Sequence, residues 1–255
     1  MNRNSPLFLA LRRFRRHKLA IFSAGVLLTM IVLVIIAPLF EQLLGVGAND
    51  VDLFKRMLPP SSEHPLGTDE LGRDVLLRLL YGGRISLFAG LTAAVFAATI
   101  GTVIGLFAGF FGGRLDAVLM RLTDSVIALP LLPLLIVLVA IDLNKIGLPQ
   151  GIVESESVSF YRIVFIVAIT GWTTVARLVR GATLSLKERE FIMAARGVGA
   201  SNLHIMFKHI LPNLLSPIIV AVTLSVGGVI LLESVLSFLG LGIQPPMASW
   251  GNMLT

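Results

Sequence analysis

Residues 85–113 read ISLFAGLTAAVFAATIGTVIGLFAGFFGG, an apolar segment without a charged side chain. The hydrocarbon core of a bilayer is about 30 Å thick and an α-helix rises about 1.5 Å per residue, so roughly 20 apolar residues span it. The segment exceeds that length. It predicts a membrane-spanning helix and places the chain among membrane proteins.

A small residue recurs at every fourth position of this segment. The stripe consists of Ala89, Ala93, Ala97, Gly101, Gly105, Gly109 and Gly113. Residues four apart share one helix face, and small side chains there allow two helices to approach closely within lipid. We therefore expect the stripe, and its four glycines above all, to pack against a neighbouring helix, either in this chain or in a second subunit.

The composition agrees with a membrane protein. Of the 255 residues 55% are hydrophobic and 14% are charged, and the mean hydropathy is +0.88. The chain has no cysteine, which excludes disulfides and thiolate chemistry, and its four histidines are too scattered to suggest a metal site. The net charge of +6 would suggest nucleic-acid binding in a soluble protein, but the basic residues here flank apolar segments, as they do at a membrane surface.

Four further segments are apolar enough to be spans. They are Leu19–Phe40, Asp124–Ile141, Phe160–Val179 and Leu214–Leu232. The first is too long for a cleaved signal peptide and is interpreted as a retained span. Phe160–Val179 contains Arg162 and Arg177, so it can cross only if both side chains snorkel toward the interfaces. The predicted fold is an all-α polytopic transmembrane helical bundle.

Lysine and arginine near the span ends predict the orientation. The N-terminal segment before Leu19 is basic and lacks acids, and residues 177–208 are also rich in Lys and Arg, so both should be cytoplasmic. Residues 41–84 and 142–161 carry more acidic than basic side chains and should lie outside. Within the N-terminal segment, Leu7–Lys18 alternates apolar and basic residues, which fits either an interfacial helix or a disordered basic tail.

A cytoplasmic loop follows the fourth span. Residues 184–213 read LSLKEREFIMAARGVGASNLHIMFKHILPN, and Ser185 with Glu188 three residues later has the pattern of a capping box. The loop is therefore predicted to begin a helix at Ser185 that runs to about Arg196.

A turn and a second helix complete this loop. Gly197 and Gly199 should stop the first helix, Ser201 can cap a second one, and Pro212 should end it. We call residues 184–212 the elbow. Its basic helix–turn–helix could suggest DNA reading, but an elbow tethered to lipid at both ends cannot readily enter a major groove. Small side chains at its turn favour insertion into a groove of a partner protein.

Charged residues and prolines inside the spans could mark a substrate site. Asp124 and Glu233 lie at span edges, where an interfacial structural role is favoured over contact with a solute. Pro130 and Pro133 free backbone carbonyls that could line a pathway, although a plain kink is the commoner outcome.

No glycine run is followed by Lys-Ser or Lys-Thr as nucleotide binding requires, so the chain is expected not to be an enzyme and to hold no cofactor.

The elbow resembles the EAA loop of permeases in binding-protein-dependent ABC importers. The resemblance is carried by residues 193–199, MAARGVG, and by residues 210–212, ILP. It implies a coupling helix that docks on an ATPase subunit. Two positions depart from the pattern: Met193 stands where the family often has Glu, and His209 where it often has Ile. Glu190 lies on much the same helix face as Met193. The implied coupling residues are Glu190, Met193, Ala194, Ala195, Arg196, Gly197, Gly199 and Pro212.

Three other segments indicate which subfamily of these permeases the chain resembles. Residues 64–87, HPLGTDELGRDVLLRLLYGGRISL, and 233–254, ESVLSFLGLGIQPPMASWGNML, are similar to the oligopeptide/dipeptide/nickel subfamily. The prefix RRFRRHK at 12–18 resembles its C-type permease. The implied domains are an N-terminal region, 1–63, and a permease transmembrane domain, 64–255. The family normally has a sixth span, whereas this sequence stops at Thr255, so it is either shortened or atypical.

The resemblance implies a type I permease of the cytoplasmic membrane that moves peptides, or a solute such as a nickel chelate, by alternating access. Its implied partners are a homologous permease, two ATP-binding subunits that hold ATP and Mg, an extracytoplasmic solute-binding protein and membrane lipid, but no nucleic acid. Three other functions are alternatives: a secondary transporter or channel that uses an ion gradient without an ATPase, a membrane-tethered DNA-binding regulator, and a passive membrane anchor. Substrate identity is not predicted.

Overall fold

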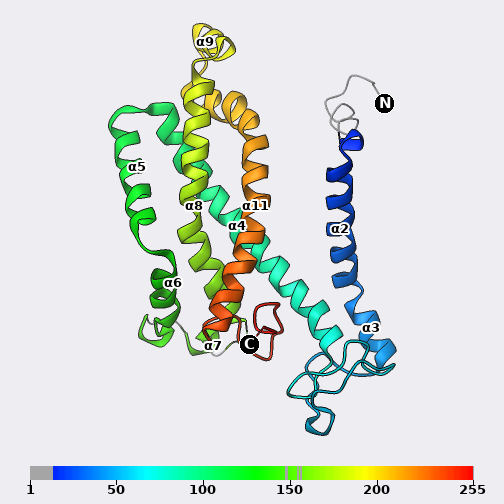
Figure 1. The fold of residues 1–255 in the computed structure, drawn as a ribbon. Coiled ribbons are helices and arrows are strands. Elements are labelled where there is room, and N and C mark those ends of the chain that lie inside the picture. The colour runs from blue at the N-terminus through cyan, green and yellow to red at the C-terminus, as the bar shows by residue number, and fades with distance from the viewer. Residues whose placement is uncertain (1–13, 147–148, 154, 156, 255) are drawn as a thin grey trace. The chain divides into compact units, whose positions relative to one another are not determined.

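The computed structural model describes residues 14–146, 149–153, 155 and 157–254, which form helices and loops with no β-strand among them (Figure 1). Four helical stretches in this part are long and apolar enough to cross a membrane: α2 (Lys18–Ile35), α4 (Val75–Phe111), α8 (Val158–Lys187) and Asn202–Phe238, which ends in α11 (Leu211–Phe238). The all-α polytopic prediction is confirmed.

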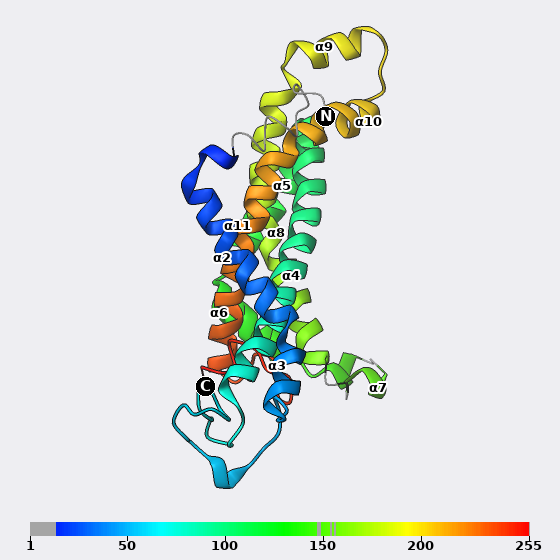
Figure 2. The ribbon, with the colours of Figure 1, turned by 90° about the vertical axis from the view of Figure 1, so that its right-hand side faces the viewer.

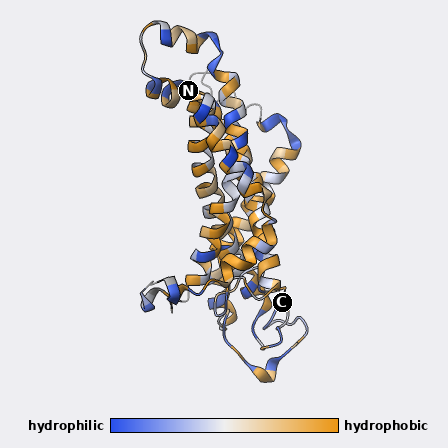
Figure 3. Ribbon diagram, turned by 90° about the vertical axis from the view of Figure 1, so that its left-hand side faces the viewer, coloured by the Kyte–Doolittle hydropathy of each residue, from blue (hydrophilic) through white to orange (hydrophobic). Residues whose placement is uncertain are grey.

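Shorter elements connect these helices. They are α3 (Ala37–Leu44), α7 (Gln150–Val153), α9 (Glu190–Gly197), α10 (Asn202–His204), two 3₁₀ turns (Leu53–Lys55 and Leu143–Ile146) and a π-helical segment, η3 (Ile205–Ile210). Apolar residues predominate along the middle of the long helices, whereas hydrophilic residues gather toward their ends (Figure 3). The predicted interfacial helix at Leu7–Lys18 lies largely outside the described residues.

The contacts divide the chain into two units, residues 1–84 and 85–255, and the division falls inside α4. The predicted boundary after residue 63 stays a prediction. In the first unit, the predicted span Leu19–Phe40 is divided between two helices, α2 and α3, and α2 is itself long and apolar enough to cross a membrane. The helix ends at Ile35 and α3 begins at Ala37, because Pro38 has no N–H to continue the ladder and sits in the first turn of α3.

A polar loop in the first unit leads into α4. The Asp74 carboxylate accepts a hydrogen bond from the Leu77 N–H at 2.8 Å and so caps α4, and its second oxygen lies 2.9 Å from His64 Nδ1. Asp69 is 2.7 Å from Arg73 Nε and accepts the N–H groups of Leu71 and Arg73. Burial raises the pKa of Asp69, but these donors outweigh burial and the pKa lies below its usual value.

The second unit is built around a close seam between α4 and α8. A Cβ on Gly101 would lie 2.5 Å from the Trp172 carbonyl oxygen, and one on Gly105 would lie 2.4 Å from that of Ala176. Gly109 is equally close to α8, with Thr183 Cβ 2.7 Å away. The neighbour that the stripe predicts is therefore α8 of the same chain. Gly113 does not share the contact. It has φ +57 and begins α5 (Gly113–Ala128), and a Cβ added there would meet nothing within 4 Å among the described residues.

The third predicted span, Asp124–Ile141, is not one helix. α5 (Gly113–Ala128) and α6 (Leu131–Ala140) meet at 85°, and together they count as one broken span or a re-entrant segment. Pro130 lacks an N–H and disfavours helical geometry in the residue before it, and Leu129 is extended with ψ 133°. Pro130 thus does more than kink a helix: the segment starts earlier than predicted and turns sharply at this residue, whereas Pro133 lies in the first turn of α6.

α8 lies between α5 and α11 in the second unit (Figure 1). Two ion pairs connect α8 to α5: Arg180 contacts both carboxylate oxygens of Asp116 at 2.5 and 2.6 Å, and Arg177 lies 2.5 Å from Asp124. Arg162, at the other end of α8, donates to the Val139 carbonyl of α6 at 2.8 Å. The cationic side chains of the fourth span therefore hold the broken third span in place.

Candidate functional site

The elbow projects from one end of the second unit, beyond the ends of α8 and α11 (Figure 2). Its first helix does not begin at Ser185 as predicted. Ser185 lies in the last turn of α8, which continues to Lys187, and α9 begins at Glu190 without a side-chain cap. Ser185 and Glu188 have the spacing of a capping box, but they do not start a helix because α8 continues through Ser185 to Lys187. The end of α9 at Gly197 agrees with the prediction within one residue.

The turn of the elbow depends on a left-handed residue. Gly199 has φ +84, a conformation that favours glycine over residues with a Cβ. The side chain of Ser201 then accepts the His204 N–H at 3.3 Å, which confirms the predicted cap of the second helix. Together these two residues fix where the chain reverses toward the membrane.

Pro212 does not end the second helix. It lies in the first turn of α11, and the helix runs without interruption from Asn202 to Phe238. The reason is the π-helical segment: the Leu211 N–H bonds the Met206 carbonyl five residues back, so the ladder has already shifted where the proline lacks a donor. Asn213 donates its side-chain amide to the His209 carbonyl at 2.6 Å.

The inner side of the elbow is anchored in an apolar core. Ile192 of α9 and Ile205, Met206 and Ile210 of η3 have no exposed surface, and they pack with α4 and α8 residues such as Phe110. Each buried side chain of this size contributes roughly 1.5–3 kcal/mol relative to exposure. The elbow is thus firmly attached to the helices behind it.

The outer side of α9 is exposed. Glu190, Met193, Ala194 and Gly197 follow the spacing i, i+3, i+4, i+7 and share one face. Met193 is 55% exposed, and a Cβ on Gly197 would meet nothing within 4 Å among the described residues. The neighbouring Val198 is 87% exposed. A largely apolar surface that none of the described residues covers is typical of an interaction site.

The eight predicted coupling residues therefore divide by position. Ala195 packs against the apolar core, and the Arg196 guanidinium lies 5.5 Å from the centre of the Phe110 ring. Pro212 belongs to α11. The remaining five, Glu190, Met193, Ala194, Gly197 and Gly199, are exposed on the elbow.

Glu233 is a residue that sequence reasoning underestimated. It lies near the end of α11 away from the elbow and is only 1% exposed. One of its carboxylate oxygens accepts the hydroxyls of Ser237 at 2.7 Å and Ser249 at 2.9 Å. A structural role was predicted at a membrane edge. The burial of Glu233 cannot be predicted from the sequence, because Ser249 reaches it from a loop whose residues show no hydrophobic periodicity.

The same C-terminal segment, residues 239–254, is joined to two other helices. The Gln244 N–H donates to the Ser159 hydroxyl of α8 at 3.3 Å, and the Trp250 N–H to the Ser86 hydroxyl of α4 at 3.0 Å. This end of the bundle is thus covered by the chain itself.

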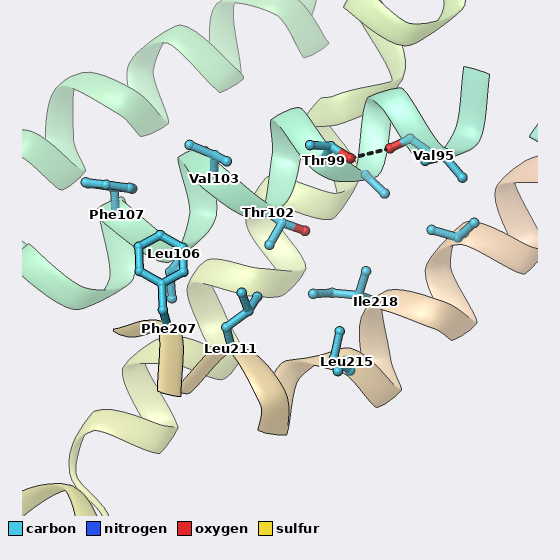
Figure 4. Close-up of a pocket in the computed structure, with 12 residues that line it drawn as sticks. Val95, Thr99, Thr102, Val103, Leu106, Phe107, Phe207, Leu211, Leu215 and Ile218 are labelled. Atoms are coloured by element: carbon cyan, nitrogen blue, oxygen red, sulfur yellow. Dashed lines mark hydrogen bonds between the residues drawn. The ribbon is translucent and has the colours of Figure 1, made fainter. Parts of the chain in front are cut away.

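An apolar groove of about 310 Å³ lies beside the elbow between α4 and the η3–α11 helix (Figure 4). Phe107 and Phe207 face it from the two sides, with Leu211 and Leu215 below them. The Thr99 hydroxyl at its rim donates to the Val95 carbonyl at 2.8 Å. The groove is suited to aliphatic groups.

Comparison with known proteins identifies the family. The model of the family described as "Binding-protein-dependent transport system inner membrane component" matches residues 101–255, which include the broken span, the elbow and α11. The chain belongs to this permease family. A second model, the N-terminal TM domain of oligopeptide transport permease C, matches residues 5–60 of the permease. The family resemblance found in the sequence is confirmed.

Similar proteins include three named peptide permeases. The oligopeptide transport system permease protein OppC of Bacillus subtilis (strain 168) is 39% identical over 96% of this chain and 74% of its own length. The dipeptide transport system permease protein DppC of the same organism is 41% identical over 96% and 71%. OppC of Escherichia coli (strain K12) is 43% identical over 96% and 76%. The permease is therefore a multi-pass membrane subunit similar to peptide permeases.

Proposed function

We propose that this permease is the membrane-spanning subunit of an ATP-driven peptide importer and that the elbow couples it to a separate ATPase. The single observation that carries the proposal is the two-sided elbow: its inner side is anchored among Ile192, Ile205 and Phe110, while its outer side is largely apolar and is not covered by the described residues. A force applied to the outer side reaches the spans because the attachment behind it is closely packed.

The orientation follows from charge. The elbow and the N-terminal segment are basic and belong on the cytoplasmic side of the inner membrane, which places residues 239–254 on the external side. In the complete importer, two ATP-binding subunits hold ATP and Mg. A homologous second permease completes the pathway, and an extracytoplasmic binding protein delivers the solute.

The proposed cycle is alternating access. Closure of the ATP-binding subunits displaces the elbow, and α11 moves with it because Asn202–Phe238 is one continuous helix. The spans then change from an inward-open to an outward-open arrangement, and hydrolysis resets them. Peptides are favoured over nickel chelates as the solute because the similar permeases are named for oligopeptides and dipeptides.

Cross-linking in the assembled importer tests the proposal. The chain has no cysteine, so Met193→Cys introduces its sole thiol on the outer side of α9. A short bifunctional reagent is expected to join this thiol to an ATP-binding subunit, whereas Gln244→Cys, at the other end of the bundle, should give no such product. Reaction of the Met193→Cys variant with a membrane-impermeant thiol reagent added outside intact cells would overturn the orientation.

Transport measurements test the energy source. Liposomes that contain the full importer should take up peptide only with ATP inside the compartment that the elbow faces. Uptake driven by an ion gradient without the ATP-binding subunits would favour the alternative of a secondary transporter or channel.

A further inference from the structure

We infer that the cleft at the break between α5 and α6 is where this subunit contacts the transported peptide, and that it recognises the peptide main chain. The inference rests on the proposed function and adds to it a place and a mode of recognition. Its basis is the coincidence of three features: a broken helix, a cavity and a set of hydroxyl groups.

The break leaves main-chain polar groups without helical partners. α5 ends at Ala128, Pro130 has no N–H to offer, and α6 begins at Leu131. Among the described residues the structure records no hydrogen bond to the carbonyl oxygens of Ile127 and Ala128, and of these two residues only Ile127 lines the adjacent cleft. Non-helical main chain at membrane depth is tolerated where protein buries it or where it lines a polar cavity. A polar group next to the break, from the protein or from a solute, would therefore satisfy these carbonyls.

A cleft of about 450 Å³ opens at this break. Ile127 and Leu131 line it from the broken span, and α8 and α11 close it from the other side. The polar side chains of the lining are Thr170, Thr173, Thr174 and Ser225. No lining residue carries a charge.

The hydroxyl groups can still bind a solute. Thr170 and Ser225 donate their protons to the Ile166 and Ala221 carbonyls of their own helices, at 2.9 and 2.8 Å, which leaves oxygen lone pairs for a donor in the cleft. Thr174 is exposed, and within the described part of the chain its hydroxyl has no recorded partner. It can therefore donate as well as accept.

Gly228 adds a steric argument. It lines the cleft from α11, and a Cβ there would meet nothing within 4 Å. Packing within this chain thus gives no reason for a glycine. A glycine in the wall does leave room for a solute to pass.

Together these groups fit the main chain of an extended peptide. Every peptide residue presents one N–H donor and one C=O acceptor, which free carbonyls and hydroxyls complement. An uncharged lining does not select among charged side chains, so recognition here would rest on the main chain that all peptides share. The groove in Figure 4 differs: its lining is a continuous helical surface with only two hydroxyls, Thr99 and Thr102.

The experiment uses two matched pairs of variants in the full importer in liposomes, with radiolabelled alanine peptides of two to five residues as the probe. Gly228→Leu fills the cleft, and Gly227→Leu adds the same side chain next to it, where a Cβ also meets nothing within 4 Å. We expect Gly228→Leu to lower uptake about tenfold or more and Gly227→Leu to change it less than about twofold. ATPase activity should persist in both.

The second pair tests recognition by hydrogen bonds. Thr174→Val removes the hydroxyl with little change of shape and should reduce uptake about threefold to tenfold, as expected for one lost hydrogen bond. Thr223→Val is its control, since the Thr223 hydroxyl lies outside the lining and bonds the Ile219 carbonyl at 3.0 Å. The thiol of a Thr174→Cys variant should also react more slowly with a maleimide when peptide and ATP are present.

The outcomes separate this inference from the proposed function. If the unmodified importer takes up no peptide, both fail. If it takes up peptide but the members of each pair behave alike, the inference alone is wrong. If Gly228→Leu loses the second permease during purification, the cleft is a subunit interface, which also overturns the inference.

Discussion

The seam between α4 and α8 and the outer side of the elbow both contain glycines, but among the described residues only the seam glycines are packed closely against a neighbour. A Cβ at Gly105 would lie 2.4 Å from main chain of α8, whereas one at Gly197 or Gly199 would meet nothing within 4 Å. Packing within this chain explains the seam glycines fully. The positive φ of Gly199 accounts for one elbow glycine, and the described residues give no packing reason for Gly197.

The largest effect is expected at the seam. Gly105→Leu would force α4 and α8 apart and should cost about 3 kcal/mol or more, because neighbouring backbone cannot yield as a flexible side chain can. We expect little folded protein after detergent extraction, measured by thermal unfolding and yield. The control is Gly181→Leu on α8, where a Cβ would meet nothing within 4 Å. Equal stability of the two variants would show that the seam is not tightly packed.

A substitution in the elbow should lower transport activity while the protein still folds. Gly199→Arg adds bulk at the turn and is expected to lower peptide uptake about tenfold or more while ATP hydrolysis continues. Its left-handed conformation, φ +84, also costs about 1 kcal/mol once a Cβ is present. Uptake and hydrolysis would be measured together in liposomes that contain the whole importer.

Gly113→Arg separates bulk at the elbow from backbone strain. Gly113 also has positive φ, +57, and an open Cβ position, but it lies at the start of α5. We expect this variant to keep uptake close to that of the unmodified importer. If both arginine variants lose transport equally, strain accounts for the result and the elbow surface does not.

A smaller effect should come from the inner side of the elbow. The Arg196 guanidinium over the Phe110 ring contributes about 0.5–1 kcal/mol, typical of a cation–π contact at an exposed site. A double-mutant cycle with Arg196→Gln and Phe110→Leu, measured by thermal unfolding, should give a coupling free energy of that size. A value near zero would mean that Arg196 is held by something other than the ring.

The smallest effect is expected from lowering the pH, which should weaken the Asp69 loop, a region outside both the seam and the elbow. Because the pKa of Asp69 is lowered in the folded loop, its carboxylate stabilises that loop fully above the ordinary carboxyl pKa of about 4. The contribution disappears as the pH falls from there through the lowered value. The protection of the Leu71 and Arg73 amides, measured relative to their intrinsic exchange rates at each pH, should fall in that range, and Asp69→Asn should abolish the part of this change that Asp69 causes. The seam should not respond, since its glycines carry no ionisable group.

The sequence predicted those features that depend on local pattern. Apolar length located the spans, the four-residue stripe located the seam, and Ser201 was placed correctly as a cap. Family resemblance was carried by short motifs that comparison with known permeases confirmed.

The features that it missed depend on context beyond one turn. Ser185 begins no helix because α8 continues through it, and Pro212 ends none because η3 has already shifted the ladder. The 85° turn near Pro130 and the burial of Glu233 both need partners distant in sequence. Local propensity gives the candidates for a helix end, and tertiary packing decides among them.

The unbroken helix from Asn202 to Phe238 has a mechanical consequence. At about 1.5 Å per residue, Gly228 lies roughly 26 Å along α11 from Leu211, so an inclination of about 5° at the elbow end sweeps the wall of the cleft sideways by about 2 Å. A displacement of that size is comparable to a hydrogen bond. A slight nudge at the base is therefore enough to make or break contacts with whatever occupies the middle of the membrane.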